Sequence, residues 1–323
     1  MLEFYKTFED GTRRIAEPEP GCWINAVAPT EEERNFLIEQ IGILPEFVKS
    51  SLDEEESSHV DYDEDEGQTL VIVDYPNADF RQLLIIFDYP SAENEDDDSI
   101  DSTYSTLPMG VVILKGYVVT ISLYENWSIL EMSQGRIKGV DTRLKTRFFL
   151  LLALRISQRF LICLRQIDRL SSRTETRLHQ SVENDELIEM LGLEKSLVYF
   201  STSLKSDEVT LSKIMRGKQI QLYEEDEDLL EDVMIEIHQA IEMCNIYSNT
   251  MAGTMDTFAS IISNNMNIVM NKLTVITIVM AIPNIIFGFY GMNVQLPFPF
   301  VWFPSFIAIL ACIIATVYFF RHN

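Results

Sequence analysis

Short apolar runs, separated by acidic, glycine or proline breakers, fill residues 22–122 of the chain. The runs are rich in Val, Ile and Tyr, and they read CWINAV, TLVIVDY, QLLIIFDY, GVVILK and YVVTIS. Runs of this length and composition predict β-strands. Two acidic segments between them, residues 54–67 and 93–99, are predicted to be solvated loops.

Helices are predicted after the first of these runs. Residues 29–42 open with Thr30, and Glu33 follows three positions later, which is the pattern of a capping box. The helix is expected to end at Gly42. The segment PEFVKSSL predicts a second short helix. Strands mixed with helices predict an α/β domain over residues 1–135.

The pattern changes from about residue 140, where long helical segments replace the short runs. These segments cover residues 142–181, 185–216 and 226 onward. The last one contains no proline from Asp226 to Pro283, so it can continue to Tyr290. Such a helix has about 65 residues and measures on the order of 100 Å, too long for a globular element. We predict a helical region over 136–225 and a stalk over 226–272.

Two charge-free apolar runs lie near the C-terminus, at residues 273–290 and 300–320. A membrane-spanning helix needs roughly 20 predominantly apolar residues, and both runs come close to this length or reach it. They predict a membrane hairpin, which adds four segments to the domain plan. These are a first transmembrane helix at 273–291, an outer loop at 292–299, a second transmembrane helix at 300–320 and a tail at 321–323.

The charges that flank these runs predict their orientation. Lys272 precedes the first run, Arg321 and His322 follow the second, and the connector has no charge. Positively charged flanks remain on the cytoplasmic side of a membrane. The N-terminus has no apolar segment of the secretory type. We therefore expect a multi-pass protein of the cell (inner or plasma) membrane, with both termini cytoplasmic.

A stripe of polar or small residues follows the long helix at steps of three or four positions. It comprises Asn264, Asn267, Asn271, Thr274, Thr277, Ala281, Asn284, Gly288 and Gly291. Unpaired amides in hydrocarbon are costly, so the stripe is expected to face protein or water. It predicts either a close helix–helix seam or a wetted axis. One hairpin cannot enclose a pore, so the second interpretation requires a ring of identical chains.

Pro283 interrupts the backbone hydrogen bonds of the same helix. Proline has no N–H to donate and clashes with the preceding turn. We expect a bend at this position and a carbonyl at Val279 that lacks its usual helical partner.

The sequence YGMN at the end of the first apolar run resembles the CorA family of divalent-cation transport proteins. The resemblance extends over essentially the whole chain, because MNKLTVIT enters the membrane, a proline-containing helix follows, and a short outer loop leads to a second helix. It implies a funnel-shaped homopentamer with an α/β cytosolic domain, a long helical stalk and two C-terminal transmembrane helices. Five first membrane helices would line one axial pore.

The same resemblance assigns residues to the pore. Gly291, Met292 and Asn293 would form the outer mouth, where the Asn293 amide selects hydrated Mg2+. An uncharged amide ring suits Mg2+ because this ion gives up its water reluctantly. The lining positions map onto Asn267, Leu273, Ala281, Asn284 and Gly288, with Leu273 as the apolar constriction.

Three features depart from the family pattern. Ala281 and Asn284 stand where many relatives have a large apolar or hydroxyl residue, which suggests a wider and more polar bore. The outer loop VQLPFP carries no acidic residue to gather cations. The tail FFRHN is short, so a basic collar at the pore exit would rest on Arg321 and Lys272.

A regulatory Mg2+ site between cytosolic domains is a further implication of the resemblance. An ungapped alignment from Asn267 places Asp232 at the acidic position that serves this role, inside the cluster EEDEDLLED. Asp79 and Asp88 are candidate partners in the α/β domain. Alternatively, the cluster favours only the helix N-terminus, where carboxylates complement the dipole.

Composition narrows the function classes. Acidic residues outnumber basic ones 50 to 25, and the net charge of −25 repels nucleic acid and attracts cations. The excess is also compatible with solubility alone. The four cysteines are far apart and predict reduced thiols. The chain lacks the HExxH, GxxxxGK, GxSxG and GxGxxG motifs, and its four histidines are isolated, so we predict no enzyme and no organic cofactor.

Taken with these patterns, the resemblance implies a channel that moves Mg2+ inward down the membrane potential and is gated by cytosolic Mg2+. The expected partners are the lipid bilayer, divalent cations and further copies of the chain. A Zn2+, Co2+ or Ni2+ transporter on the same scaffold is one alternative. A membrane-anchored helical scaffold or sensor without transport is another, in which the polar stripe is only a seam.

Overall fold

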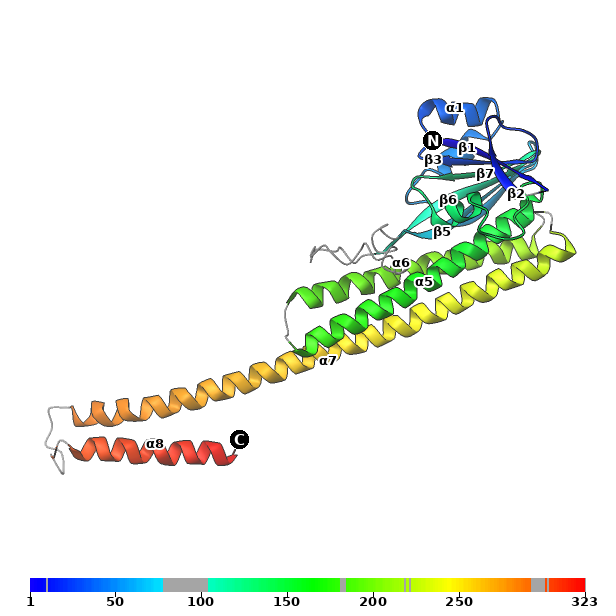
Figure 1. Cartoon of the computed structure of the whole chain (residues 1–323). Coiled ribbons are helices and arrows are strands. Elements are labelled where there is room, and N and C mark those ends of the chain that lie inside the picture. Colours follow the sequence, from blue (N-terminus) through cyan, green and yellow to red (C-terminus); the bar gives the residue numbers. More distant parts are fainter. Residues whose placement is uncertain are drawn as a thin grey trace. The chain divides into compact units, whose positions relative to one another are not determined.

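The computed structural model describes the chain except for residues 10, 78–103, 181–183, 218, 221, 292–299, 301 and 323 (Figure 1). Contacts between residues divide it into two compact units, Met1–Thr254 and Met255–Asn323. The predicted strand QLLIIFDY, the acidic segment 93–99 and the candidate ligands Asp79 and Asp88 lie outside the described residues.

The first unit contains a seven-stranded sheet with the order β2-β1-β3-β7-β6-β5-β4. The strands are β1 (Leu2–Phe8), β2 (Gly11–Ile15), β3 (Cys22–Val27), β4 (His59–Asp63), β5 (Gln68–Asn77), β6 (Ser105–Leu114) and β7 (Tyr117–Ser122). Strands β3 and β7 pair in parallel, and the other neighbours are antiparallel. Four of the predicted runs are therefore confirmed as strands.

Two short helices, α1 (Glu31–Glu39) and α2 (Pro45–Ser50), cover one face of the sheet (Figure 1). Leu37 and Phe47 pack there against alternate strand residues such as Leu70 and Ile72, as the two-residue period of a strand requires. The Thr30–Glu33 capping box is confirmed. Helix α1 ends at Glu39, three residues before Gly42.

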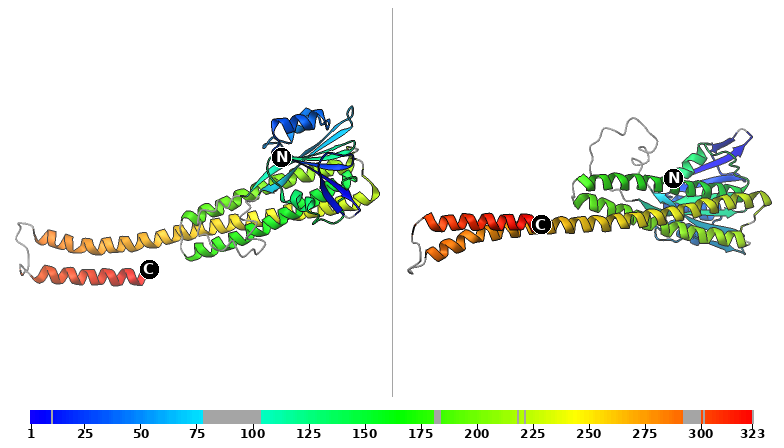
Figure 2. Two further views of the ribbon diagram at one scale, coloured as in Figure 1. Left: turned by 45° about the horizontal axis from the view of Figure 1, so that its top comes forward. Right: turned by 90° about the horizontal axis from the view of Figure 1, so that it is seen from below.

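Long helices cover the opposite face. Helices α5 (Lys145–Gln180) and α6 (Asn184–Arg216) lie beside the start of α7 (Glu224–Tyr290) (Figure 2). The short helix α4 (Trp127–Ser133) precedes them in the chain. The buried residues of α7 in this unit recur at steps of three or four, at Leu230, Val233, Ile237, Ala240 and Cys244. This spacing places the buried residues on one apolar face of the helix. The long helices predicted from about residue 140 onward are confirmed.

One loop prediction is wrong in part. Within the acidic segment 54–67, the residues His59–Asp63 form the edge strand β4, paired with β5 from Ile72 to Gln68. The side chains of Asp61 and Tyr62 are exposed. Edge strands carry charge without losing their backbone pairing, and charge at an edge also opposes association with other sheets.

Two carboxyl groups are buried where α6 meets the sheet. Strand β4 pairs with β5 only as far as Ile72, and β5 continues past that point. In this continuation the Asp74 N–H donates to Asp207 Oδ1 at 3.0 Å. The Ser58 hydroxyl donates to the Ile72 carbonyl at 2.8 Å, and Ser203 contacts Thr106. Burial and the neighbouring Asp74 raise the pKa of Asp207 well above its usual range, and burial raises the pKa of Asp74.

The second unit contains the remainder of α7 and helix α8 (Trp302–His322). From Ala259 to Tyr290, α7 has no fully buried side chain in the single chain. Its exposed residues include Ile268, Val269, Met270, Leu273 and Ile276. Exposed apolar surface of this extent requires cover from lipid or from other protein chains.

We predict that Asp207→Asn stabilises the protein at neutral and alkaline pH. The folded chain holds the Asp207 proton to a higher pH than the unfolded chain does, so wild-type stability falls as pH rises from about 4 through the raised pKa. Asparagine cannot ionise, so the variant does not lose this stability. The difference in the free energy of unfolding between the variant and wild type should grow by up to about 1.4 kcal/mol per pH unit. Thermal unfolding of the full-length protein between pH 4 and pH 9 measures it. The exposed Asp65→Asn is the control, and parallel wild-type and Asp207→Asn profiles would contradict the prediction.

Candidate functional site

Two helices are long and apolar enough to cross a membrane. They are α7, by virtue of its C-terminal part, and Trp302–Phe319 of α8. None of the apolar window of α7 and 6% of that of α8 is buried inside the single chain. Soluble core helices of this length are mostly buried, so low burial distinguishes these two from a core hairpin.

The two helices meet along a seam of apolar and small residues. On α7 the half-buried seam residues are Val275, Val279, Ile282, Ile286 and Tyr290. On α8 the corresponding face carries Ile307, Ala308, Ala311, Cys312, Ala315 and Thr316. Ala308 is only 4% exposed. Small residues at steps of three or four allow two helix backbones to approach closely.

The polar stripe of α7 lies on another face. Asn267, Thr274, Thr277, Asn284 and Gly288 are all exposed in the single chain. Each helical residue advances by about 100°, which places the positions from Thr274 to Gly288 about half a turn from the seam residues. The stripe is therefore not on the face of α7 that packs against α8. A seam between copies and a wetted axis both remain compatible with this geometry.

The stripe combines satisfied hydroxyls with open amides. Thr274 Oγ1 donates to the Met270 carbonyl, and Thr277 Oγ1 donates to the Leu273 carbonyl, both at 2.8 Å. These bonds use the hydroxyl protons within the helix and leave oxygen lone pairs as acceptors. The amide of Asn284 offers both a donor and an acceptor on the same exposed face. Such a surface can hydrogen-bond water or a hydrated cation.

The glycine at position 288, near the end of α7, is not required by packing within the hairpin. A Cβ on Gly288 would meet no atom within 4 Å. Gly291 follows the last helical residue, and its N–H donates to the Phe287 carbonyl at 2.8 Å. The face around Gly288 is therefore open to whatever approaches it from outside the chain.

The other predicted site residues have different placements. Leu273 is 55% exposed, and Ala281 is half-buried. Met292 and Asn293 lie outside the described residues, so their role as the mouth stays a prediction. Asp232 is exposed on α7. Among the described residues, no group of three or more His, Cys, Asp or Glu side chains could hold a metal ion.

One contact in the hairpin involves a residue that the sequence did not single out. The Cys312 thiol lies 3.5 Å from the Val279 carbonyl oxygen, the acceptor that Pro283 leaves without its usual partner. The sequence signalled the carbonyl through Pro283. It gave no sign of which residue of the second helix would reach it.

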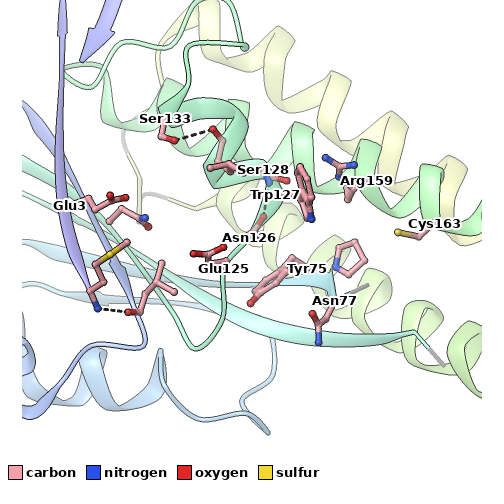
Figure 3. A pocket seen from close by; sticks show the side chains of 15 residues that line it. Glu3, Tyr75, Asn77, Glu125, Asn126, Trp127, Ser128, Ser133, Arg159 and Cys163 are labelled. Carbon is pink, nitrogen blue, oxygen red and sulfur yellow. Dashed lines mark hydrogen bonds between the residues drawn. The ribbon is translucent and has the colours of Figure 1, made fainter. Parts of the chain in front are cut away.

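A cavity of about 270 Å3 in the first unit lies between α4, α5 and the sheet (Figure 3). The Arg159 guanidinium lies over the Trp127 ring at 5.7 Å and pairs with Glu131 at 3.1 Å. Glu3 and Glu125 also line the cavity. Its charges are mixed, and the Arg159–Glu131 pair joins α5 to α4.

The sequence and fold are similar to those of known transport proteins. A family model described as CorA-like Mg2+ transporter protein matches residues 19–322. The chain is 27% identical over 280 residues to the cobalt/magnesium transport protein CorA of Methanocaldococcus jannaschii, covering 84% of this chain and 79% of that protein.

Solved structures support the fold. The complete structure of the CorA magnesium transporter from Methanocaldococcus jannaschii matches with a TM-score of 0.78 at 22% identity, covering 99% of this chain and 96% of that chain. The full-length CmaX protein matches with a TM-score of 0.70 at 17% identity, covering 100% and 97%. The predicted architecture of an α/β domain, a long helix and two C-terminal apolar helices is confirmed.

We predict that cysteines on the two faces of α7 differ in their access to water. In membranes, Asn284→Cys and Gly288→Cys should react with a charged, membrane-impermeant thiol reagent at least tenfold faster than Ile282→Cys and Ile286→Cys. The four native cysteines, three buried and one half-buried, give the unmodified background. Equal, slow labelling at all four positions would show that the polar face is packed, as in a non-transporting scaffold.

Proposed function

The chain belongs to the family of CorA-like Mg2+ transporter proteins, and from this premise we propose that it is a divalent-cation channel that carries Mg2+ into the cytosol. The observation that carries this proposal is the exposed polar face of α7, roughly opposite the seam with α8. In a bilayer this face requires water or protein beside it. A line of amides and hydroxyl oxygens beside water suits a hydrated cation.

A ring of chains completes the pore. One hairpin has a single polar face and cannot surround water, whereas symmetric copies can place several such faces around one axis. The family resemblance favours five copies in the cell membrane. The positively charged flanks at Lys272 and Arg321 favour termini in the cytoplasm. The open surface at Gly288 supports close approach of neighbouring copies there.

The membrane potential supplies the driving force. A divalent ion that crosses 100 mV gains roughly 4.6 kcal/mol, from about 2.3 kcal/mol for each charge. The chain needs no ATP site for inward movement, and its sequence contains no GxxxxGK motif.

Selection is assigned to the outer end of the pore. An Asn293 ring would accept the intact water shell of Mg2+, with Gly291 and Met292 shaping the mouth. Asn284, Ala281, Gly288 and Asn267 would line the path, and the Leu273 side chains would form its apolar constriction.

Co2+ is a second candidate cargo. The Methanocaldococcus jannaschii relative is named a cobalt/magnesium transport protein. The outer loop of this chain has no acidic residue that would favour one divalent ion electrostatically. Competition between Mg2+, Co2+, Ni2+ and Zn2+ for uptake into liposomes separates these cargoes.

Regulation is assigned to Asp232. The residue is exposed and follows four acidic residues in the first turn of α7. A Mg2+ ion bound between neighbouring copies would offset the repulsion between their carboxylates. When that ion leaves, repulsion would loosen the ring and allow the constriction at Leu273, on the same helix, to open.

We predict that Asn293→Ala abolishes selective uptake while the oligomer stays assembled, because only the outer amide ring is lost. Mg2+ flux into liposomes should fall at least tenfold, with an unchanged elution volume in size-exclusion chromatography. Gln295→Ala removes another amide from the same uncharged loop and should leave the flux intact. Wild-type flux in Asn293→Ala would remove this residue from the mechanism.

We predict that Asp232→Lys makes protection against proteolysis independent of Mg2+. The lysine supplies fixed positive charge in place of the ion, whereas wild type should be protected only at millimolar Mg2+, about the range of weak carboxylate sites. Limited proteolysis with and without chelator measures this difference. Glu231→Lys makes the same charge change at the adjacent exposed position and should keep the Mg2+ dependence. Equal sensitivity of wild type in both conditions would reject the sensor role.

A further inference from the structure

Pro283 creates a local deficit of hydrogen bonding inside the apolar part of α7. In an α-helix the N–H of each residue donates to the carbonyl four positions earlier, so residue 283 should serve Val279. Proline has no N–H, although the helix continues through it to Tyr290. In hydrocarbon, a carbonyl left without a donor cannot turn to water for one. A second donor at Val279 would therefore have a specific stabilising effect.

Helix α8 supplies that donor. The Cys312 thiol lies 3.5 Å from the Val279 oxygen and is half-buried in the seam. The neighbouring small residues Ala308, Ala311 and Ala315 leave room for the close approach. Thr316, one turn further along the same face, directs its hydroxyl to the Cys312 carbonyl of its own helix at 2.7 Å. Of these two polar side chains on the seam, Cys312 is the one that reaches across.

We propose that Cys312 is a positioning residue of the ion path: its thiol replaces the donor that Pro283 lacks and holds α7 against α8 at Val279. Val279 belongs to the seam, while Ala281 and Asn284, within five residues of it, belong to the polar stripe. A change in the position of α7 at Val279 therefore moves the stripe as well. The inference rests on the proposed function in one respect, because it matters for transport only if that stripe lines the ion path.

A double-mutant cycle tests the hydrogen bond without reference to transport. Cys312→Val removes the donor and adds about one methyl group of volume, whereas Pro283→Ala restores the helical N–H to Val279. We expect Cys312→Val to speed amide hydrogen exchange in peptides covering residues 276–290 of the full-length protein by about threefold, the size of an average interhelical hydrogen bond in a membrane. In the Pro283→Ala background the same change should have little effect, because the carbonyl already has a donor.

Two further variants separate the bond from packing. Cys312→Ser keeps a donor and should preserve slow exchange. Thr316→Val removes a hydroxyl from the same face of α8 whose partner is not on α7, so its effect should be equal in both backgrounds. An equal effect of Cys312→Val in both backgrounds would show that the residue contributes only packing, which would overturn the proposal.

Uptake into liposomes then tests the positioning role. We expect Cys312→Val to change the rate of Mg2+ uptake, or its selectivity over Co2+, by at least threefold, and Cys312→Ser to restore the wild-type value. A coupled exchange cycle with unchanged uptake in Cys312→Val would show a bond that does not position the path, and would also overturn the proposal. If wild type itself carries no cation, the proposed function fails, while the exchange cycle still decides whether Cys312 serves Val279.

Discussion

The requirement that every backbone polar group find a partner away from water governs the second unit, Met255–Asn323. From Ala259 to Tyr290, helix α7 has no fully buried side chain in the single chain, so lipid or other copies must cover it. A continuous helix satisfies its own backbone in such surroundings. Pro283 is an exception to that rule, and the Cys312 thiol of α8 lies where it can compensate. The two helices of the hairpin are thus joined by a specific polar contact as well as by apolar packing.

The two faces of α7 differ in what they contact within the chain. Val279 and Ile286 belong to the face that packs on α8, while Asn284 and Gly288 project from roughly the opposite side. A helix with one committed apolar face and one exposed polar face cannot be fully satisfied as a single chain in a bilayer. Assembly around a shared axis resolves this conflict, because it gives the amides water and leaves the remaining apolar surface to lipid. This is the physical basis for proposing a pore made from several chains.

The N-terminal unit contains a pair of buried carboxyl groups. Most of its described carboxyl side chains are in contact with solvent, but those of Asp74 and Asp207 are buried together where α6 meets strand β5. Burial raises the pKa of both carboxyl groups, and the cost of ionising them ties the packing of α6 to pH. Other carboxylates, such as that of Asp232, are exposed to solvent.

The sequence by itself determined the elements whose signals are local. The Thr30–Glu33 capping box, four strands, the long helices and the two apolar runs follow from residues close in the chain, and YGMN added the family. The partners of those elements were decided by the tertiary structure. The charged edge strand at His59–Asp63 forms because β5 lies beside it, and Asp74 meets Asp207 across 133 positions. Likewise, the sequence left the polar stripe of α7 as either a seam or a wetted axis, and only the packing of α8 on another face excluded a seam within the hairpin. Cys312 reaches Val279 for the same reason: contacts between distant residues depend on how helices rotate and approach, which no local pattern encodes.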